Sequence, residues 1–234
     1  MHMLEGGLSG YFESSAAYPD FRRIVSPSRK FTGDNGDAIY FDAPISHDCS
    51  YIIKGEMGTA CYFSLTLEVG TGGGRMASKT EGVLNDTDID VAGDGTFVVY
   101  LGGKERDRNW LPVPPGVTRV TTRHYFEEER CAAADPERTP RLAIAALGIS
   151  GPPPVPDDAA VAAGIRRVAG FVRSRTVDQP PMVNAEQPPF VSLVPNSFPP
   201  PVVPGDFGLA AFDAHYSMAP YFLGEEEALL INGR

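Results

Sequence analysis

Short runs rich in apolar and β-branched residues, with strand-like periodicity, constrain the fold of this chain more than any other feature. They cover residues 38–41, 51–55, 59–69, 88–91, 96–101, 117–126 and 141–147. Side chains of a β-strand point alternately to its two faces, so each run predicts a strand with one buried face. Turn-forming residues separate the runs, such as Asp94-Gly95 before the fifth. About seven such strands predict a mainly β fold, an antiparallel β-sandwich or barrel.

One amphipathic helix is expected after these strands, from about Ala159 to Arg173. Val161, Ile165 and Val168 recur there at helical spacing and give the helix one apolar face. Asp157 precedes the first turn, where a carboxylate can cap the free backbone N–H groups. This segment is therefore the clearest helix that the sequence predicts.

Turn-forming and proline-rich segments divide the chain into three parts. Residues 1–30 form a lead-in segment with one short helix near residues 11–17, and residues 31–150 form the β-sandwich core. Residues 151–234 hold a proline linker, the helix, a proline-rich extended segment and a C-terminal strand at 228–231. Phe190, Val191, Leu193 and Phe198 lie among the prolines, which favours a docked segment over free disorder.

Charge and composition exclude some classes of protein. The formal net charge of -10 argues against nucleic-acid binding, which needs clustered cations. No apolar run reaches the roughly 20 residues of a membrane-spanning helix, and the N-terminus lacks the basic and apolar regions of a signal peptide. The three cysteines are widely spaced and odd in number, which predicts no disulfide framework, and Cys61 is expected to be a small buried residue. We therefore expect a cytoplasmic protein.

A metal site is not predicted. The four histidines have no mutual metal-ligand spacing. Asp86, Asp88 and Asp90 would share one face of a strand, but the segment lacks the glycine and glutamate of a calcium-binding EF-hand loop. A solvated edge strand is the favoured interpretation. No organic cofactor is predicted either.

The residues around His124 are the strongest candidates for a site. On a strand, Arg123 and Tyr125 face one way, while His124 and Phe126 face the other. If Phe126 is in the core, His124 is partly buried and Glu127 lies with the outward pair. Arg123 and Tyr125 then suit an anionic or hydroxylated ligand, with Glu127 as base or hydrogen-bond acceptor. A structural ion pair beside a packed tyrosine is the alternative.

Two further segments add candidates. Trp110 is the only tryptophan, and it is either a loop plug over the core or a stacking platform for a sugar or another flat ligand. Asp34 and Asn35 precede the strand that carries Tyr40, in a segment with turn chemistry. Their simplest interpretation is a structural turn. The alternative is that Asp34 places a carboxylate at the mouth of a pocket.

Together these segments resemble a bacterial family called domain of unknown function 1214, which is related to domain of unknown function 1254. The matching pieces are Asp34 to Tyr40, Tyr51 to Gly55, Tyr62 to Thr66, Asp94 to Thr96, Asn109 to Pro112, Arg123 to Tyr125 and Pro195 to Phe198. The resemblance implies a jelly-roll-like β-sandwich and no particular activity. The stretch from Ala214 to Leu230 is similar to longer actinobacterial-type members, so a C-terminally shortened member is expected.

Function is therefore predicted in three alternative classes. The first is a module that binds a small hydroxylated or apolar ligand, carbohydrate-like or lipid-like, through Trp110, Arg123, Tyr125, Tyr40 and Asn35. The second is a metal-independent hydrolase or lyase that uses the catalytic groups Glu127, His124 and Asp34. The third is a subunit of an oligomer, completed by another chain or by a missing C-terminal partner segment. The binding module leads because no nucleophile–base arrangement is visible.

Overall fold

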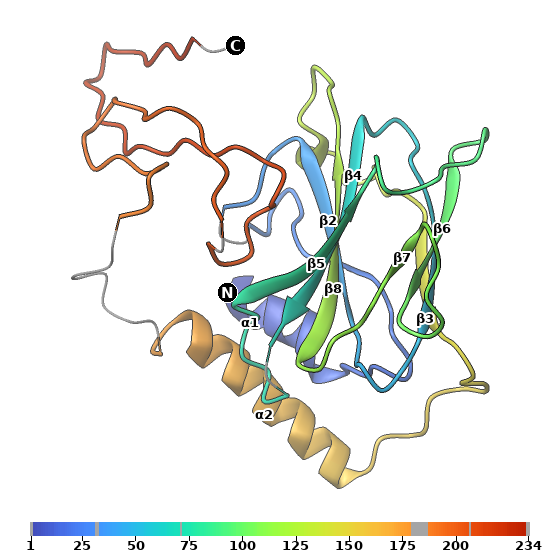
Figure 1. Ribbon diagram of the computed structural model, residues 1–234. Coiled ribbons are helices and arrows are strands. Elements are labelled where there is room, and N and C mark those ends of the chain that lie inside the picture. Colours follow the sequence, from blue (N-terminus) through green and yellow to red (C-terminus); the bar gives the residue numbers. More distant parts are fainter. Residues whose placement is uncertain (1, 31–32, 71, 179–186, 206, 233–234) are drawn as a thin grey trace. The chain divides into compact units, whose positions relative to one another are not determined.

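The structure is a computed structural model that describes residues 2–30, 33–70, 72–178, 187–205 and 207–232 (Figure 1). Two compact units divide the chain, residues 1–179 and residues 180–234. The first unit is mainly β and also holds the helices. Among the described residues, no helix has both the length and the apolar character needed to cross a membrane.

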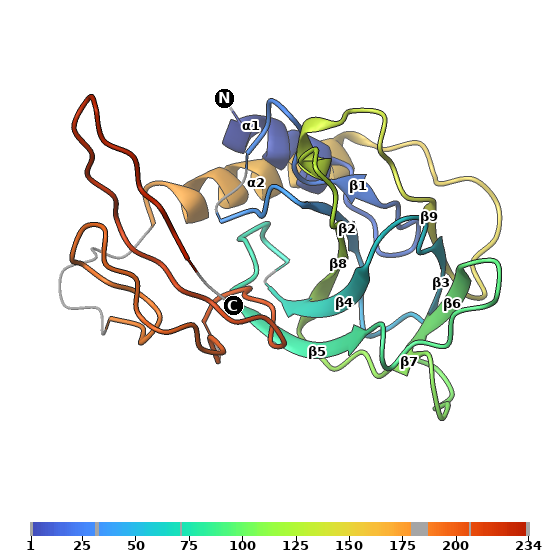
Figure 2. The same ribbon diagram turned by 90° about the horizontal axis from the view of Figure 1, so that it is seen from above.

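The first unit contains two sheets (Figure 2). The strands are β1 (Arg22–Arg23), β2 (Ala38–Pro44), β3 (Tyr51–Glu56), β4 (Tyr62–Val69), β5 (Lys79–Asn85), β6 (Thr96–Leu101), β7 (Trp110–Leu111), β8 (Val117–Tyr125) and β9 (Leu142–Ala146). The five-stranded sheet has the order β1-β2-β8-β4-β5, and the four-stranded sheet has the order β7-β6-β3-β9. Neighbouring strands are antiparallel, except that β6 and β7 are parallel.

The core lies between the two sheets. Phe63 and Leu65 reach it from β4, and Ile53 and Val99 reach it from β3 and β6. Each of these side chains is fully buried. Burial of one such side chain contributes roughly 1.5–3 kcal/mol, so the alternation in the sequence is satisfied by packing the apolar faces together. The mainly β, sandwich-like architecture that the sequence predicts is confirmed.

One of the strands that the sequence predicts in the first unit is wrong. The 88–91 run is a turn, because Asn85 Oδ1 accepts hydrogen bonds from the Thr87 amide and hydroxyl at 3.0 and 2.6 Å and bends the chain. Asp90 instead pairs with Arg108 at 2.6 Å. The strand in this region is β5, which the sequence did not reveal because Gly82 interrupts its apolar pattern. Among the described residues, no group of three metal-ligating side chains forms.

The helices of the first unit are α1 (His2–Gly7), the single-turn π-helix η1 (Leu8–Phe12), the 3-10 turn η2 (Ala132–Ala134) and α2 (Asp158–Arg175). The sequence predicted α2 correctly, and Asp157 Oδ1 accepts a hydrogen bond from the Ala160 amide at 2.8 Å. The lead-in helix begins earlier than predicted. Arg167 of α2 donates to the carbonyl oxygens of Tyr11 and Phe12 at 2.9 and 2.8 Å. The N-terminal segment is thereby tied to α2.

The second unit has little regular structure. Phe190 is its buried centre and lies 5.1 Å from Phe207 and 5.8 Å from Tyr216, measured between ring centroids. Isolated bridges join Val191 to Met218 and Val202 to Tyr216. The strand expected at 228–231 is wrong, because these residues form no ladder and Leu230 is 82% exposed. Part of the expected proline-rich segment, residues 179–186 and 206, lies outside the described residues.

The backbone of the loop between β4 and β5 lies very close to the backbone of α2. A Cβ atom at Gly170 would lie 2.1 Å from the Gly73 carbonyl oxygen. A Cβ atom at Gly74, which has φ +83°, would lie 2.0 Å from the Arg167 carbonyl oxygen. Such approaches cannot be relieved by a side-chain rotation, so these two glycines set the spacing between the helix and the loop.

We predict that Gly170→Ala destabilises the protein, although alanine favours a helix by up to about 1 kcal/mol. The added methyl group must push the loop away from α2, and overpacking of this kind costs roughly 1–3 kcal/mol. Urea unfolding followed by circular dichroism measures the change. Gly93→Ala is the control, because its Cβ atom would meet no neighbour. Equal stabilities of the two variants would contradict the prediction.

Candidate functional site

The outer face of the five-stranded sheet is built of polar side chains. We call this set the polar face; its members are Tyr40, Asp42, Tyr62, Ser64, Thr66, Glu68, Thr80, Asn85, Arg119, Thr121, Arg123 and Tyr125. The opposite face carries the core residues of the same strands. Ordinary solvent-exposed sheet faces carry scattered polar residues. A face that gathers charges, hydroxyls and phenols is a candidate site.

The register places these side chains in rows across β2, β8, β4 and β5. The rows are Tyr40–Arg123–Ser64–Asn85, then Asp42–Thr121–Thr66, then Arg119–Glu68–Thr80. Directly opposed residues of neighbouring strands have Cβ atoms about 4.5–5.5 Å apart. Each row is therefore a line of polar groups in mutual reach.

Arg119 anchors one end of the polar face. It is 4% exposed and forms an ion pair with Asp42. Its Nη1 atom donates to the Gly10 carbonyl oxygen at 3.1 Å, and its guanidinium lies 4.6 Å from the centre of the Tyr11 ring. Burial raises the pKa of Tyr11, although the Arg119 charge opposes the shift. The N-terminal segment thus covers this end of the sheet with a neutral phenol.

Glu68 is the buried carboxyl group in the same row as Arg119. Burial raises its pKa, and the positive charge of Arg123 is the strongest opposing effect. Thr121 forms a hydrogen bond with the carboxyl group and also lowers its pKa. Arg123 in turn donates from Nη1 to the Thr66 hydroxyl at 2.9 Å. The middle of the polar face therefore combines a carboxyl that holds its proton more readily than usual with a buried guanidinium.

Three buried atoms of the polar face make no hydrogen bond with any described group. They are Ser64 Oγ, Thr80 Oγ1 and Arg119 Nε. Buried polar groups normally have a partner, since leaving one unpaired costs roughly 1–3 kcal/mol. Two hydroxyls that accept and donate, together with one cationic donor, match the hydrogen-bonding groups of a water molecule or a hydroxylated compound.

The other end of the polar face is aromatic. Tyr62 and Tyr125 pack edge to face with their ring centroids 5.3 Å apart. The hydroxyl of Tyr40 accepts a hydrogen bond from the Asn35 amide at 3.0 Å. Asn35 Oδ1 in turn accepts from the Asp37 amide at 2.8 Å, which fixes the turn before β2. Phenol rings and an exposed turn thus border the charged centre.

The structure brings together some of the sequence-predicted ligand residues. Arg123, Tyr125 and Tyr40 share the polar face, and Asn35 adjoins Tyr40. Trp110 does not join them, because it lies in β7 of the other sheet, paired with Tyr100, and its indole Nε1 donates to the Gly102 carbonyl oxygen at 2.9 Å.

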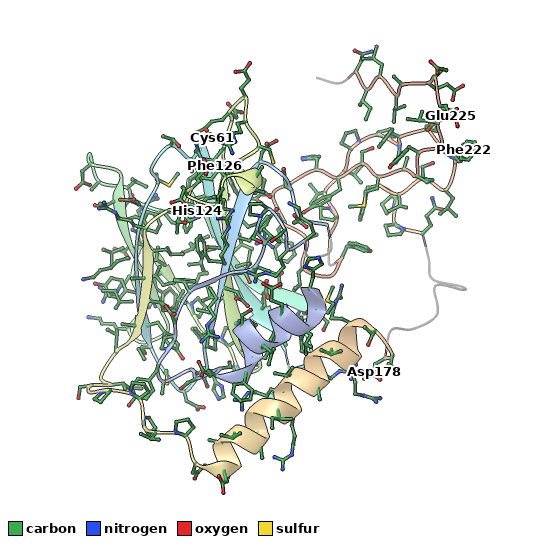
Figure 3. All side chains as sticks on the ribbon, turned by 180° about the vertical axis from the view of Figure 1, so that it is seen from behind. Cys61, His124, Phe126, Asp178, Phe222 and Glu225 are labelled. Atoms are coloured by element: carbon green, nitrogen blue, oxygen red, sulfur yellow. The ribbon has the colours of Figure 1, made fainter. Side chains whose placement is uncertain are left out.

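The residues proposed for acid–base chemistry lie in different environments. His124 faces inward as predicted, but it is fully buried and not partly buried, between the rings of Phe63 at 4.7 Å and Phe41 at 6.4 Å (Figure 3). Glu127 is exposed beyond β8, and Asp34 lies 3.7 Å from Lys30. The imidazole is therefore on the core side of the sheet, opposite the polar face.

Burial lowers the pKa of His124 to about 4, although the nearby backbone of Glu56 opposes the shift. Neither ring nitrogen has a hydrogen-bond partner of good geometry among the described groups. The neutral imidazole acts as a flat core residue. Cys61, expected to be buried, is exposed just before β4 and its Sγ lies 3.3 Å from the Tyr125 carbonyl oxygen (Figure 3). The three cysteines are unpaired, as the sequence predicts.

Sequence reasoning missed several residues of the polar face. Ser64, Thr66 and Glu68 alternate with core residues of β4, and this two-residue spacing is a signal that was available. Tyr11 gives no such signal, because its role depends on how the N-terminal segment crosses the sheet.

A shallow hollow of about 320 Å³ lies elsewhere on the first unit, beside η2. Thr59, Phe126 and Arg138 line it, and Arg138 stacks 4.8 Å above the Phe126 ring. Arg138 also forms an ion pair with Glu128. The cation that lines the hollow is therefore already paired.

Comparisons with known proteins identify the fold and no family. No family model matches the chain, and no curated protein matches it. The chain is similar to the crystal structure of an uncharacterized protein from Burkholderia cenocepacia, with a TM-score of 0.67 and 25% identity, over 86% of this chain and 53% of that one. It spans about half the length of that protein. A second match is the VPA0106 protein from Vibrio parahaemolyticus, with a TM-score of 0.32, 17% identity and coverage of 55% and 31%.

We predict that Asp42→Leu destabilises the protein by several kcal/mol, on the order of 3, because it leaves the Arg119 charge buried without its partner. The double variant Asp42→Leu/Arg119→Met should recover much of that loss, since it removes both charges. Chemical denaturation of the single and double variants measures the coupling. Equal losses in both would show that the ion pair is not the interaction that matters.

We predict that His124 lowers the stability as the pH drops from about 6.5 to 4, while Glu68, whose pKa burial raises, acts in the opposite direction. The unfolded chain binds a proton at His124 near pH 6.5, while the folded chain resists until its pKa of about 4. The unfolded state therefore gains protons first, and the loss reaches roughly 3 kcal/mol at the lower pH. His124→Leu should remove this destabilising contribution from the profile. His47→Gln, at an exposed position, should leave it unchanged. Thermal melts across this pH range provide the test.

Proposed function

We propose that this chain is a binding module for a small hydroxylated ligand of carbohydrate-like chemistry, held on the polar face. The single observation that supports this most is the gathering of hydroxyl, phenol and charged side chains on one sheet face, where Ser64 Oγ, Thr80 Oγ1 and Arg119 Nε also have no hydrogen-bond partner among the described groups. A ligand with several hydroxyl groups offers both donors and acceptors to such atoms. A lipid-like ligand fits less well, because an acyl chain would leave them unpaired.

The charges of the polar face also favour a neutral ligand. Two guanidinium groups, of Arg119 and Arg123, stand beside two carboxyl groups, of Asp42 and Glu68. Asp42 offsets the charge of Arg119, and the raised pKa of Glu68 favours its neutral form beside Arg123, so the net charge of the face is small. Arg123 then contributes charge-assisted hydrogen bonds to hydroxyl groups, and the Glu68 carboxyl group can donate or accept a hydrogen bond. Tyr62 and Tyr125 supply ring surface beside them.

We also propose that the sandwich is jelly-roll-like and that the chain is a relative of the domain of unknown function 1214 family. Successive long strands from β2 to β9 change sheets at every step except from β4 to β5, which are neighbours in the five-stranded sheet. The last long strand of that sheet, β8, lies between β2 and β4, so its neighbours are distant in sequence. Of the motifs that carry the resemblance, those on β2, β4 and β8 lie on the sheet that carries the polar face, whereas the others lie at β3, β6 and β7 and in the second unit. Three unpaired cysteines support a cytoplasmic setting.

Calorimetric titration with sugars, polyols and fatty acids tests the proposed function. We predict saturable binding of one class of hydroxylated compounds. Ser64→Ala and Thr80→Val should each weaken it by roughly threefold to tenfold, the worth of one hydrogen bond, without loss of the fold. Trp110→Phe is the matched control and should leave the affinity unchanged. Binding of fatty acids alone, or loss of binding in the control variant, would overturn the proposal.

A further inference from the structure

The four-stranded sheet has one edge that lacks the usual protection. Protein edges are commonly kept from pairing by very short strands, charged residues or bulges. β1 and β7 have two residues each, and β5 carries the ion pair Lys79–Glu81 and a register shift against β4. β9 has five residues, Leu-Ala-Ile-Ala-Ala, without a charge or a proline. Among the strands that the structure describes, only β3 pairs with it.

Backbone geometry shows which groups of β9 point away from β3. The Glu56 amide donates to the Arg141 carbonyl oxygen at 3.1 Å, and the Leu147 amide donates to the Ser50 carbonyl oxygen at 2.7 Å. Odd-numbered residues of this segment therefore bond to β3. In an antiparallel pair, the residues between them direct their N–H and C=O groups to the other side. Leu142, Ile144 and Ala146 thus present their backbone groups at the open edge.

We propose that a second copy of this chain binds at this edge, through antiparallel pairing of β9 with β9 about Ile144. Leu142 then opposes Ala146 of the second copy, and Ile144 opposes itself. Each of these pairs exchanges N–H···O=C bonds in both directions. The two four-stranded sheets join into one continuous sheet with two-fold symmetry, which is the commonest symmetry of oligomers.

The side chains of the segment fit a second copy. Ala143 and Ala145 are exposed on the outer face and oppose each other across the two-fold axis, so no bulky or like-charged groups meet. Arg141, whose side chain is 88% exposed, opposes Leu147 of the second copy. Its aliphatic part can cover that leucine, which is 47% exposed in the single chain. Residues 141–147 of one chain are thus complementary to the same residues of another chain. For this reason we assign the edge to a second copy.

This proposal places the oligomer contact at β9, whereas the sequence suggested a contact through residues 228–231. The expected pairing strand at 228–231 is not a strand, whereas β9 is a formed strand with an open side. The contact also lies on a different sheet from the polar face. Dimer formation and ligand binding are therefore separately testable.

A charge-pattern experiment tests the pairing. Ala143→Glu/Ala145→Glu places like charges opposite each other twice across the axis, whereas Ala143→Glu/Ala145→Lys places opposite charges there. Both variants carry the same change at position 143, beside Lys54, and both positions are exposed, so we expect both variants to fold. Sedimentation equilibrium of the wild-type chain should show a dimer. The first variant should weaken it by roughly tenfold and the second should retain it.

Amide hydrogen exchange provides an independent readout. The amides of Leu142, Ile144 and Ala146 should exchange more slowly as the protein concentration rises from micromolar to millimolar. The amides of Ala143 and Ala145 bond to β3 and should be protected at every concentration. A wild-type chain that stays monomeric, or a dimer that the Ala143→Glu/Ala145→Glu variant does not weaken, would overturn the proposal. If the wild-type chain is monomeric, the edge of β9 would instead be open to pairing with an extended segment of a different protein.

Discussion

The central constraint in this structure is the position of β8, which pairs with β2 on one side and β4 on the other. Its inward residues fill the core, so its outward residues, Arg119 and Arg123, stand on the middle strand of a sheet. A buried guanidinium costs several kcal/mol unless it is paired. Asp42, the Gly10 carbonyl oxygen and the Tyr11 ring meet that requirement for Arg119. The N-terminal segment is placed by this cluster, and α2 follows because Arg167 bonds to the same segment.

Regular alternation made most of the long strands predictable, and local chemistry explains the failures. Asn85 turns the chain with its side chain, so the alternating residues after it never enter a sheet. Gly82 interrupts the apolar pattern of β5, so this strand was not predicted from the sequence. The two faces of β8 were assigned correctly, since side-chain direction needs only the strand period. The extent of burial was not, because the environments of His124 and Arg119 depend on residues distant in sequence, such as Phe63 and Tyr11.

The same distinction explains how much of the candidate site was predictable. Arg123, Tyr125 and Tyr40 were found because they lie on strands whose pattern is clear. Trp110 was grouped with them on residue type alone, and composition cannot tell which sheet a short strand joins. β7 is placed by its parallel pairing with β6 over two residues. The hydrogen bond from the Trp110 indole to the Gly102 carbonyl oxygen adds to this. Those contacts depend on the path of the loop from 102 to 109, which residue type alone does not reveal.

The two sheets meet different physical demands, and this separates the two proposals. The five-stranded sheet buries charges on its outer face, which leaves hydroxyls unpaired there and favours a ligand that can pair with them. The four-stranded sheet exposes small residues at β9, so its unpaired groups belong to the backbone. Backbone groups in a row recognise another strand irrespective of sequence, whereas scattered hydroxyls recognise a polyhydroxylated molecule. A ligand on the first surface and a second copy on the second therefore require no shared residue, and either can be correct without the other.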